Sequence, residues 1–132
     1  MSLRTIAEIN SLSREEFVRV VGPVFEHSPW IAEATWPRRP FAGVEELHCA
    51  LCETIKSSGE AKQRALICVH PDLVGRLALA GELTRESRNE QAGAGLDKLS
   101  PAEIQLFQES NASYREKFGF PFVICARMNK KE

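Results

Sequence analysis

A histidine next to a proline is the first residue of this sequence that could do chemistry. His70 opens the segment His70-Pro71-Asp72-Leu73, directly after a stretch with helical character. An imidazole gives and takes protons near neutral pH, and the proline restricts the backbone that carries it. The same histidine could instead close the last turn of the helix by bonding its free carbonyl groups. His70 is therefore a candidate general acid or base, with a structural role as the alternative.

A second polar group lies between Ser87 and Gln91, just before the run Ala92-Gly93-Ala94-Gly95-Leu96. Ser87, Glu90 and Gln91 are three and four residues apart, so on a helix they share one face and could converge on one polar ligand. The small residues that follow allow a ligand or another backbone to approach closely. The alternative is a capping box formed by Ser87 and Glu90, which contributes only stability.

The third segment, Phe118 to Ile124, is apolar but lacks the periodicity of a helix. Its main-chain N–H groups must find partners, and a planar, amide-rich ligand could supply them. The alternative is a connection that fills the core. Phe122 to Cys125 has strand-like composition, but one short strand cannot make a sheet.

Other sites are excluded by their spacing. His48-Cys49-x-x-Cys52 resembles half of a zinc site, but no second pair follows at a suitable distance, so no metal site is predicted. A glycine-rich phosphate loop, a nucleophile elbow and an H-E-x-x-H motif are also missing from the sequence. All four cysteines are predicted to be buried free thiols in a reducing compartment: Cys49, Cys52, Cys68 and Cys125.

Length and composition predict one domain with a real core, because the chain has 132 residues and 43% of them are hydrophobic. Seventeen basic and eighteen acidic residues give a net charge of −1, without the basic surface of a nucleic-acid-binding protein. No apolar run is long enough for a signal peptide or a membrane span, so we expect a cytoplasmic protein without a membrane partner.

The periodicity predicts helices. A capping box at Ser13 opens one helix, which Gly22-Pro23 ends early; others are expected from Val44 to Ser57 and from Ala61 to Val69. The last helix begins at Ser100-Pro101 and ends at Gly119, and Asn111 on its apolar stripe is expected to bond buried backbone groups. Trp30 and Trp36 are predicted to be packing anchors. The predicted fold is an all-α, single-domain helical bundle.

Taken together, the three polar or irregular segments resemble the signature of the OHCU decarboxylase family, in which OHCU stands for 2-oxo-4-hydroxy-4-carboxy-5-ureidoimidazoline. The third segment matches together with the residue before it, as Lys117-Phe118-Gly119-Phe120-Pro121-Phe122-Val123-Ile124, and His27-Ser28-Pro29-Trp30 and Arg39-Pro40-Phe41 also match. The resemblance spans Phe17 to Arg127. Each motif alone is weak, but their order and spacing are specific.

The resemblance implies roles for named residues. His70 would be the acid/base residue and Glu90 its acidic partner in an enzyme that converts OHCU to (S)-allantoin without a cofactor, during urate degradation. The implied substrate-binding residues are Pro71, Ser87, Arg88, Asn89, Glu90, Gln91, Phe122, Val123, Ile124, Cys125 and Ala126.

The resemblance also implies an all-helical homodimer. Family members generally continue with further helical sequence beyond the position of Glu132, so a C-terminal helical segment is expected to be lacking here. Two alternatives stay open. One is another cofactor-free lyase or hydrolase acting on a small amide-rich ring. The other is a helical protein-interaction module whose partner surface is marked by Trp30 and Trp36.

Overall fold

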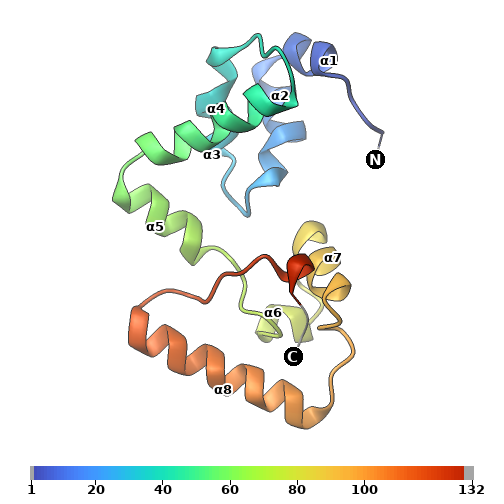
Figure 1. Cartoon of the computed structure of the whole chain (residues 1–132), viewed down its shortest axis with the longest axis vertical. Coiled ribbons are helices and arrows are strands. Elements are labelled where there is room, and N and C mark those ends of the chain that lie inside the picture. Colours follow the sequence, from blue (N-terminus) through green and yellow to red (C-terminus); the bar gives the residue numbers. More distant parts are fainter. Residues whose placement is uncertain (1, 130–132) are drawn as a thin grey trace. The chain divides into compact units, whose positions relative to one another are not determined.

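Helices are the regular elements of the computed structural model, which describes residues 2–129 and their side chains, apart from those of Arg76, Leu77 and Arg127 (Figure 1). Within that range no strand is present, so the predicted all-α class is confirmed. In chain order the elements are α1 (Ile6–Ser11), α2 (Arg14–Val21), η1 (Gly22–Val24), α3 (Trp30–Thr35), η2 (Trp36–Arg38), α4 (Val44–Ser57), α5 (Glu60–Cys68), α6 (Arg76–Leu79), α7 (Arg85–Gly93), α8 (Pro101–Phe118) and η3 (Ala126–Met128), where η marks a 3-10 helix.

The chain forms two compact units, Met1–Leu66 and Ile67–Glu132. The expectation of a single domain stays a prediction. No helix among the described residues is both long enough and apolar enough to cross a membrane.

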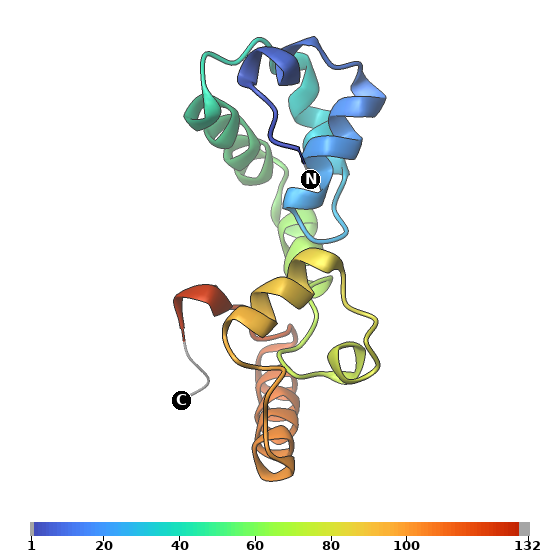
Figure 2. The ribbon, with the colours of Figure 1, turned by 90° about the vertical axis from the view of Figure 1, so that its right-hand side faces the viewer.

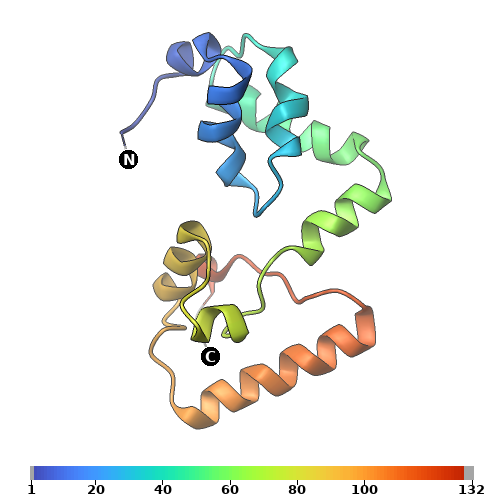
Figure 3. The ribbon, with the colours of Figure 1, turned by 180° about the vertical axis from the view of Figure 1, so that it is seen from behind.

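The first unit is built around an apolar core to which α1, α2, α3 and α4 contribute (Figure 3). Its centre is Phe17, whose ring stacks at 6.4 Å on that of Phe41. The buried members are Ile9, Leu12, Phe17, Val21, Ile31, Ala32, Phe41, Ala50 and Leu51. Trp30 and Trp36 pack against this core, as predicted, and the Trp36 indole N–H donates to the Leu12 carbonyl at 3.2 Å.

The helix boundaries of the first unit follow the sequence signals closely. Ser13 and Glu16 form the predicted capping box, and α2 ends where Gly22-Pro23 enters the 3-10 turn. Val44, the first residue of α4, is 72% exposed. The core contacts of α4 begin one turn later, at Leu47.

The prediction of buried cysteines is also wrong for most of them. Cys49, Cys68 and Cys125 are exposed and Cys52 is partly exposed, although all four are free thiols. The reason is clearest in α4, where Leu47, Ala50 and Leu51 form the face that packs on the core. Cys49 is two residues from Leu47, which turns its side chain about 200° away from that face.

The second unit contains the longest helix, α8, and a chain reversal. A capping box of Ser100 and Glu103 with Pro101 in the first turn begins α8, and Gly119 in the left-handed conformation (φ 77°) ends it, as predicted. The chain then runs back as an irregular segment to η3, which packs against α7 (Figures 1 and 2). The strand-like composition of Phe122 to Cys125 therefore produces an extended wall and no strand.

Candidate functional site

A small hollow in the second unit brings the three sequence segments together. Its volume is about 60 Å³. Its walls come from the loop after α5, from α7 and from the segment after α8. The lining residues are His70, Pro71, Leu73, Ser87, Glu90, Gln91, Phe122, Val123, Ile124 and Ala126. All of these except Leu73 were candidates from the sequence. Of the remaining candidates, Arg88, Asn89 and Cys125 do not line the hollow.

Helix α7 explains why some neighbours in sequence reach the hollow and others do not. Its N-cap is Thr84, whose hydroxyl accepts the Ser87 N–H at 3.3 Å, so the helix begins before Ser87. The alternative in which Ser87 itself caps the helix is therefore wrong. Ser87 shares one helical face with Glu90 and Gln91. Arg88 lies off that face and donates to the Gly81 carbonyl at 3.2 Å.

Glu90 connects two walls of the hollow. Its Oε1 accepts the Ala126 N–H at 2.8 Å, across 36 residues of sequence. The resemblance implied that Ala126 binds the substrate, but in the structure its main-chain N–H is bonded to Glu90. This bond therefore ties the start of η3 to α7.

Gln91 supports the loop that carries His70. It is 7% exposed, and its Oε1 accepts the Val74 N–H at 3.1 Å. Its Nε2 lies 3.5 Å from the Asp72 carbonyl oxygen, at the long limit of a hydrogen bond. The sequence predicted a substrate-binding amide at this position. In the structure the same amide bonds the protein's own backbone while one side of it lines the hollow.

The loop itself begins where α5 ends. His70 is partly exposed, and its N–H donates to the Ile67 carbonyl at 3.2 Å. Gly75 leaves room for Asp72, since a Cβ at this position would lie 2.8 Å from the Asp72 Cβ. The Leu73 carbonyl accepts from Asn111 Nδ2 at 2.7 Å, which confirms the prediction that Asn111 bonds a backbone group.

No group of three or more His, Cys, Asp or Glu side chains that could hold a metal ion occurs in the described part of the chain. In the incomplete zinc motif, Cys52 Sγ lies 3.6 Å from His48 Nε2, one helical turn away. Cys49 is exposed on the same helix.

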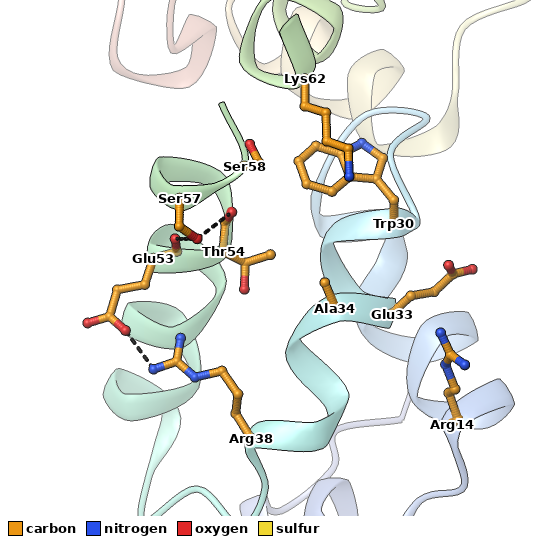
Figure 4. A pocket seen from close by; sticks show the side chains of 10 residues that line it. All are labelled: Arg14, Trp30, Glu33, Ala34, Arg38, Glu53, Thr54, Ser57, Ser58 and Lys62. Atoms are coloured by element: carbon orange, nitrogen blue, oxygen red, sulfur yellow. Dashed lines mark hydrogen bonds and ion pairs between the residues drawn. The ribbon is translucent and has the colours of Figure 1, made fainter. Parts of the chain in front are cut away.

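A larger hollow of about 650 Å³ lies in the first unit, among α3, α4 and the start of α5 (Figure 4). None of the residues predicted for the substrate site lines it, although Trp30, which the alternative assigned to a partner surface, does. Arg38 is paired with Glu53 at 2.6 Å, and Lys62 Nζ lies 5.2 Å from the centre of the Trp30 ring. The hydroxyls of Thr54, Ser57 and Ser58 bond carbonyls of their own helix. This hollow therefore offers an ordinary polar surface, and the smaller hollow is the better candidate site.

Comparisons with known proteins agree with the order of the motifs. Residues 10–132 match the family described as OHCU decarboxylase. The chain is 42% identical over 127 residues to the 2-oxo-4-hydroxy-4-carboxy-5-ureidoimidazoline decarboxylase of Halalkalicoccus jeotgali, covering 96% of this chain and 70% of that protein. It is 49% identical over 125 residues to the protein of the same name from Amia calva, covering 95% and 71%.

A solved structure is also similar. The crystal structure of an (S)-allantoin synthase superposes with a TM-score of 0.73 at 25% sequence identity. The match covers 98% of this chain and 40% of that one, so the solved protein is considerably longer.

Proposed function

The chain belongs to the OHCU decarboxylase family, and we propose that it decarboxylates OHCU to (S)-allantoin in urate degradation, without a cofactor. One observation carries the proposal. Residues that are distant in sequence line one hollow: His70, Ser87, Glu90, Gln91, Phe122, Val123, Ile124 and Ala126. A proton-transferring imidazole, a carboxylate and polar groups for a planar amide-rich ring are the parts that this reaction needs.

The substrate supplies its own electron sink. Its carboxylate-bearing carbon lies next to a C=N bond, so the electron pair of the breaking C–CO2 bond moves into that imine as CO2 leaves. The electron pair ends on the ring nitrogen and leaves an enol. One proton is then added to one face of the ureido-bearing carbon, while the hydroxyl proton is passed to the ring nitrogen and the hydroxyl becomes the carbonyl of allantoin, which gives a single enantiomer. The protein has to orient the carboxylate across the π-system and to deliver that proton. No pyridoxal or thiamine sink is required.

We assign the proton transfer to His70. Its place at the end of α5, beside Pro71 and at the edge of the hollow, allows the imidazole to reach a bound ring. Glu90 lines the same hollow as His70, so its carboxylate faces the proposed binding place of the ring. Its proposed task is to favour the protonation state in which His70 can act. Its hydrogen bond to the Ala126 N–H also keeps the opposite wall in place.

The hollow is small for a whole substrate. Its volume of about 60 Å³ compares with roughly 300–1,000 Å³ for drug-sized ligand sites. Phe122, Val123 and Ile124 are between 37% and 46% exposed. We infer that these side chains move as the ring enters, and that the main chain beside them then faces the ring and ureido edges.

The test uses freshly generated OHCU with circular dichroism as the readout, since the signal reports both the rate and the handedness of allantoin. The protein should accelerate formation of the (S) enantiomer, and His70→Ala should slow turnover by about a hundred- to ten-thousand-fold. Its helical content should be unchanged, because His70 is outside the helices. An unchanged rate with the wild-type chain would favour an interaction module; near-wild-type turnover of folded His70→Ala would remove His70 from the mechanism.

We also infer a cytoplasmic homodimer. Exposed Cys49, Cys68 and Cys125 persist as free thiols most readily in a reducing compartment. Leu106 and Phe118 leave apolar surface exposed on α8, at 63% and 44%, which a second subunit could cover. Sedimentation velocity should therefore give twice the chain mass, and a single-chain mass over the micromolar range would rule the dimer out.

A further inference from the structure

The loop after His70 is held in a conformation that its own sequence disfavours. Val74 has a φ of 54° and is 2% exposed. A branched side chain rarely adopts this left-handed region, so surrounding contacts must fix it there. The bonds that do so come from two helices, α7 through Gln91 and α8 through Asn111.

Asn111 makes the shortest of these bonds. Its Nδ2 donates to the Leu73 carbonyl at 2.7 Å, linking positions 38 residues apart. One turn further along α8, Arg115 Nη2 lies 2.9 Å from Asp72 Oδ1. These side chains are 47% and 28% exposed, so the ion pair is partly screened by water and adds little to stability. Asn111 is therefore the main tie between α8 and the residues that follow His70.

The same face of α8 also contacts the opposite wall. Tyr114 lies three residues after Asn111, and its ring meets the rings of Phe120 and Phe122 edge-on at 6.0 and 5.3 Å. Helix α8 therefore contacts both walls of the hollow, the loop after His70 through Asn111 and the segment after α8 through Tyr114. A substitution at Asn111 should move the loop while the contacts of Tyr114 hold the other wall in place.

We propose that Asn111 is the positioning residue for His70. By fixing the Leu73 carbonyl it sets the direction of the loop, and with it the place of the imidazole relative to the substrate. This inference rests on the proposed function, in which His70 transfers the proton. Productive geometry usually requires placement within about 0.5 Å, so loss of this bond should affect the chemical step more than binding.

Asn111→Leu tests the proposal, because leucine keeps the volume and removes the donor. We expect kcat to fall by about tenfold to a hundredfold while KM changes by less than about threefold. Gln108→Leu is the matched control, since it is the same kind of change at an exposed position of α8. Asn111→Asp, which keeps the shape but places an acceptor against the Leu73 carbonyl, should lose kcat as well. Circular dichroism establishes that each variant is folded.

The histidine NMR signals separate positioning from a merely structural role. The chain has three histidines, of which His27 and His48 belong to the first unit. In Asn111→Leu the ring signals of His70 should shift and the pH profile of kcat/KM should change, with His27 and His48 unmoved. Suppose that His70→Ala is inactive, but that in Asn111→Leu the His70 signals do not move and kcat equals that of Gln108→Leu. This result would overturn the positioning role of Asn111. An active His70→Ala would instead overturn the proposed function and, with it, this inference.

Discussion

At the scale of single residues, the site shows how one side chain can serve both structure and chemistry. Glu90 accepts the Ala126 N–H, and Gln91 accepts the Val74 N–H, although both line the hollow. The sequence predicted ligand-binding roles for both residues, with a capping box as the alternative for Glu90, but not these bonds to distant backbone groups. Their bonds to the backbone mean that truncation to alanine would remove a wall as well as a functional group. Informative substitutions must therefore keep the hydrogen bond.

Glu90→Gln meets that requirement. The amide oxygen can still accept the Ala126 N–H, whereas the negative charge proposed to act on His70 is gone. We expect an unchanged melting temperature and a fall in kcat of about a hundredfold, measured by steady-state turnover and thermal unfolding. A variant that melts at the wild-type temperature and retains full turnover would limit Glu90 to its structural bond.

At the scale of secondary-structure elements, capping decides where several helices begin. Thr5 with Glu8, Ser13 with Glu16 and Ser100 with Glu103 each form a reciprocal capping box. In the first two, hydrogen bonds from the cap lower the pKa of the acid. For Glu8 the largest cause is the Thr5 backbone N–H, and for Glu16 it is the Ser13 hydroxyl.

Acid should therefore weaken the start of α2. A carboxyl group whose pKa is lower in the folded state stabilises that state above its unfolded pKa. The stabilisation is lost as the pH falls through the folded pKa. We expect Ser13→Ala to lower the melting temperature at neutral pH and to flatten its dependence on pH in the acid range. Ser2→Ala, outside the helices, serves as the control. If the melting temperatures of Ser13→Ala and of the wild type fell in parallel with decreasing pH, the Ser13 hydroxyl would not be the cause of the lowered Glu16 pKa.

At the scale of the whole molecule, the apolar surface is unevenly covered. The first unit has a continuous core, whereas α8 has no buried side chain. The apolar residues along this helix include Ile104, Phe107, Tyr114 and Phe118, and Phe118 is 44% exposed. An amphipathic stripe shows which face of a helix is apolar, but it does not show whether another element of the same chain covers that face.

The proposed independence from a cofactor can be tested on the intact protein. The proposed substrate carries its own electron sink, so exhaustive chelation and dialysis should leave CO2 release and the single allantoin enantiomer unchanged. Cys52 Sγ and His48 Nε2 lie 3.6 Å apart on α4 and belong to the incomplete zinc motif. Activity that disappears on chelation and returns with one specific metal would contradict the cofactor-free mechanism and our account of these cysteines.

The sequence by itself determined the helical class, most helix boundaries and most of the residues that line the hollow. These depend on short-range physics: capping at Ser13 and Ser100, the stop before Pro71, and the shared face of Ser87, Glu90 and Gln91. The family signature adds the chemistry, because its motifs keep their order along the chain.

Only the tertiary structure decided what these residues bond. The pairing of Glu90 with Ala126, of Gln91 with Val74 and of Asn111 with Leu73 spans 17 to 38 positions. No local pattern encodes such distances, since each depends on how α7 and α8 meet the two irregular segments. For the same reason the exposure of the cysteines and of the apolar face of α8 could not be read from periodicity. A helix of given sequence buries only the side that a neighbour covers.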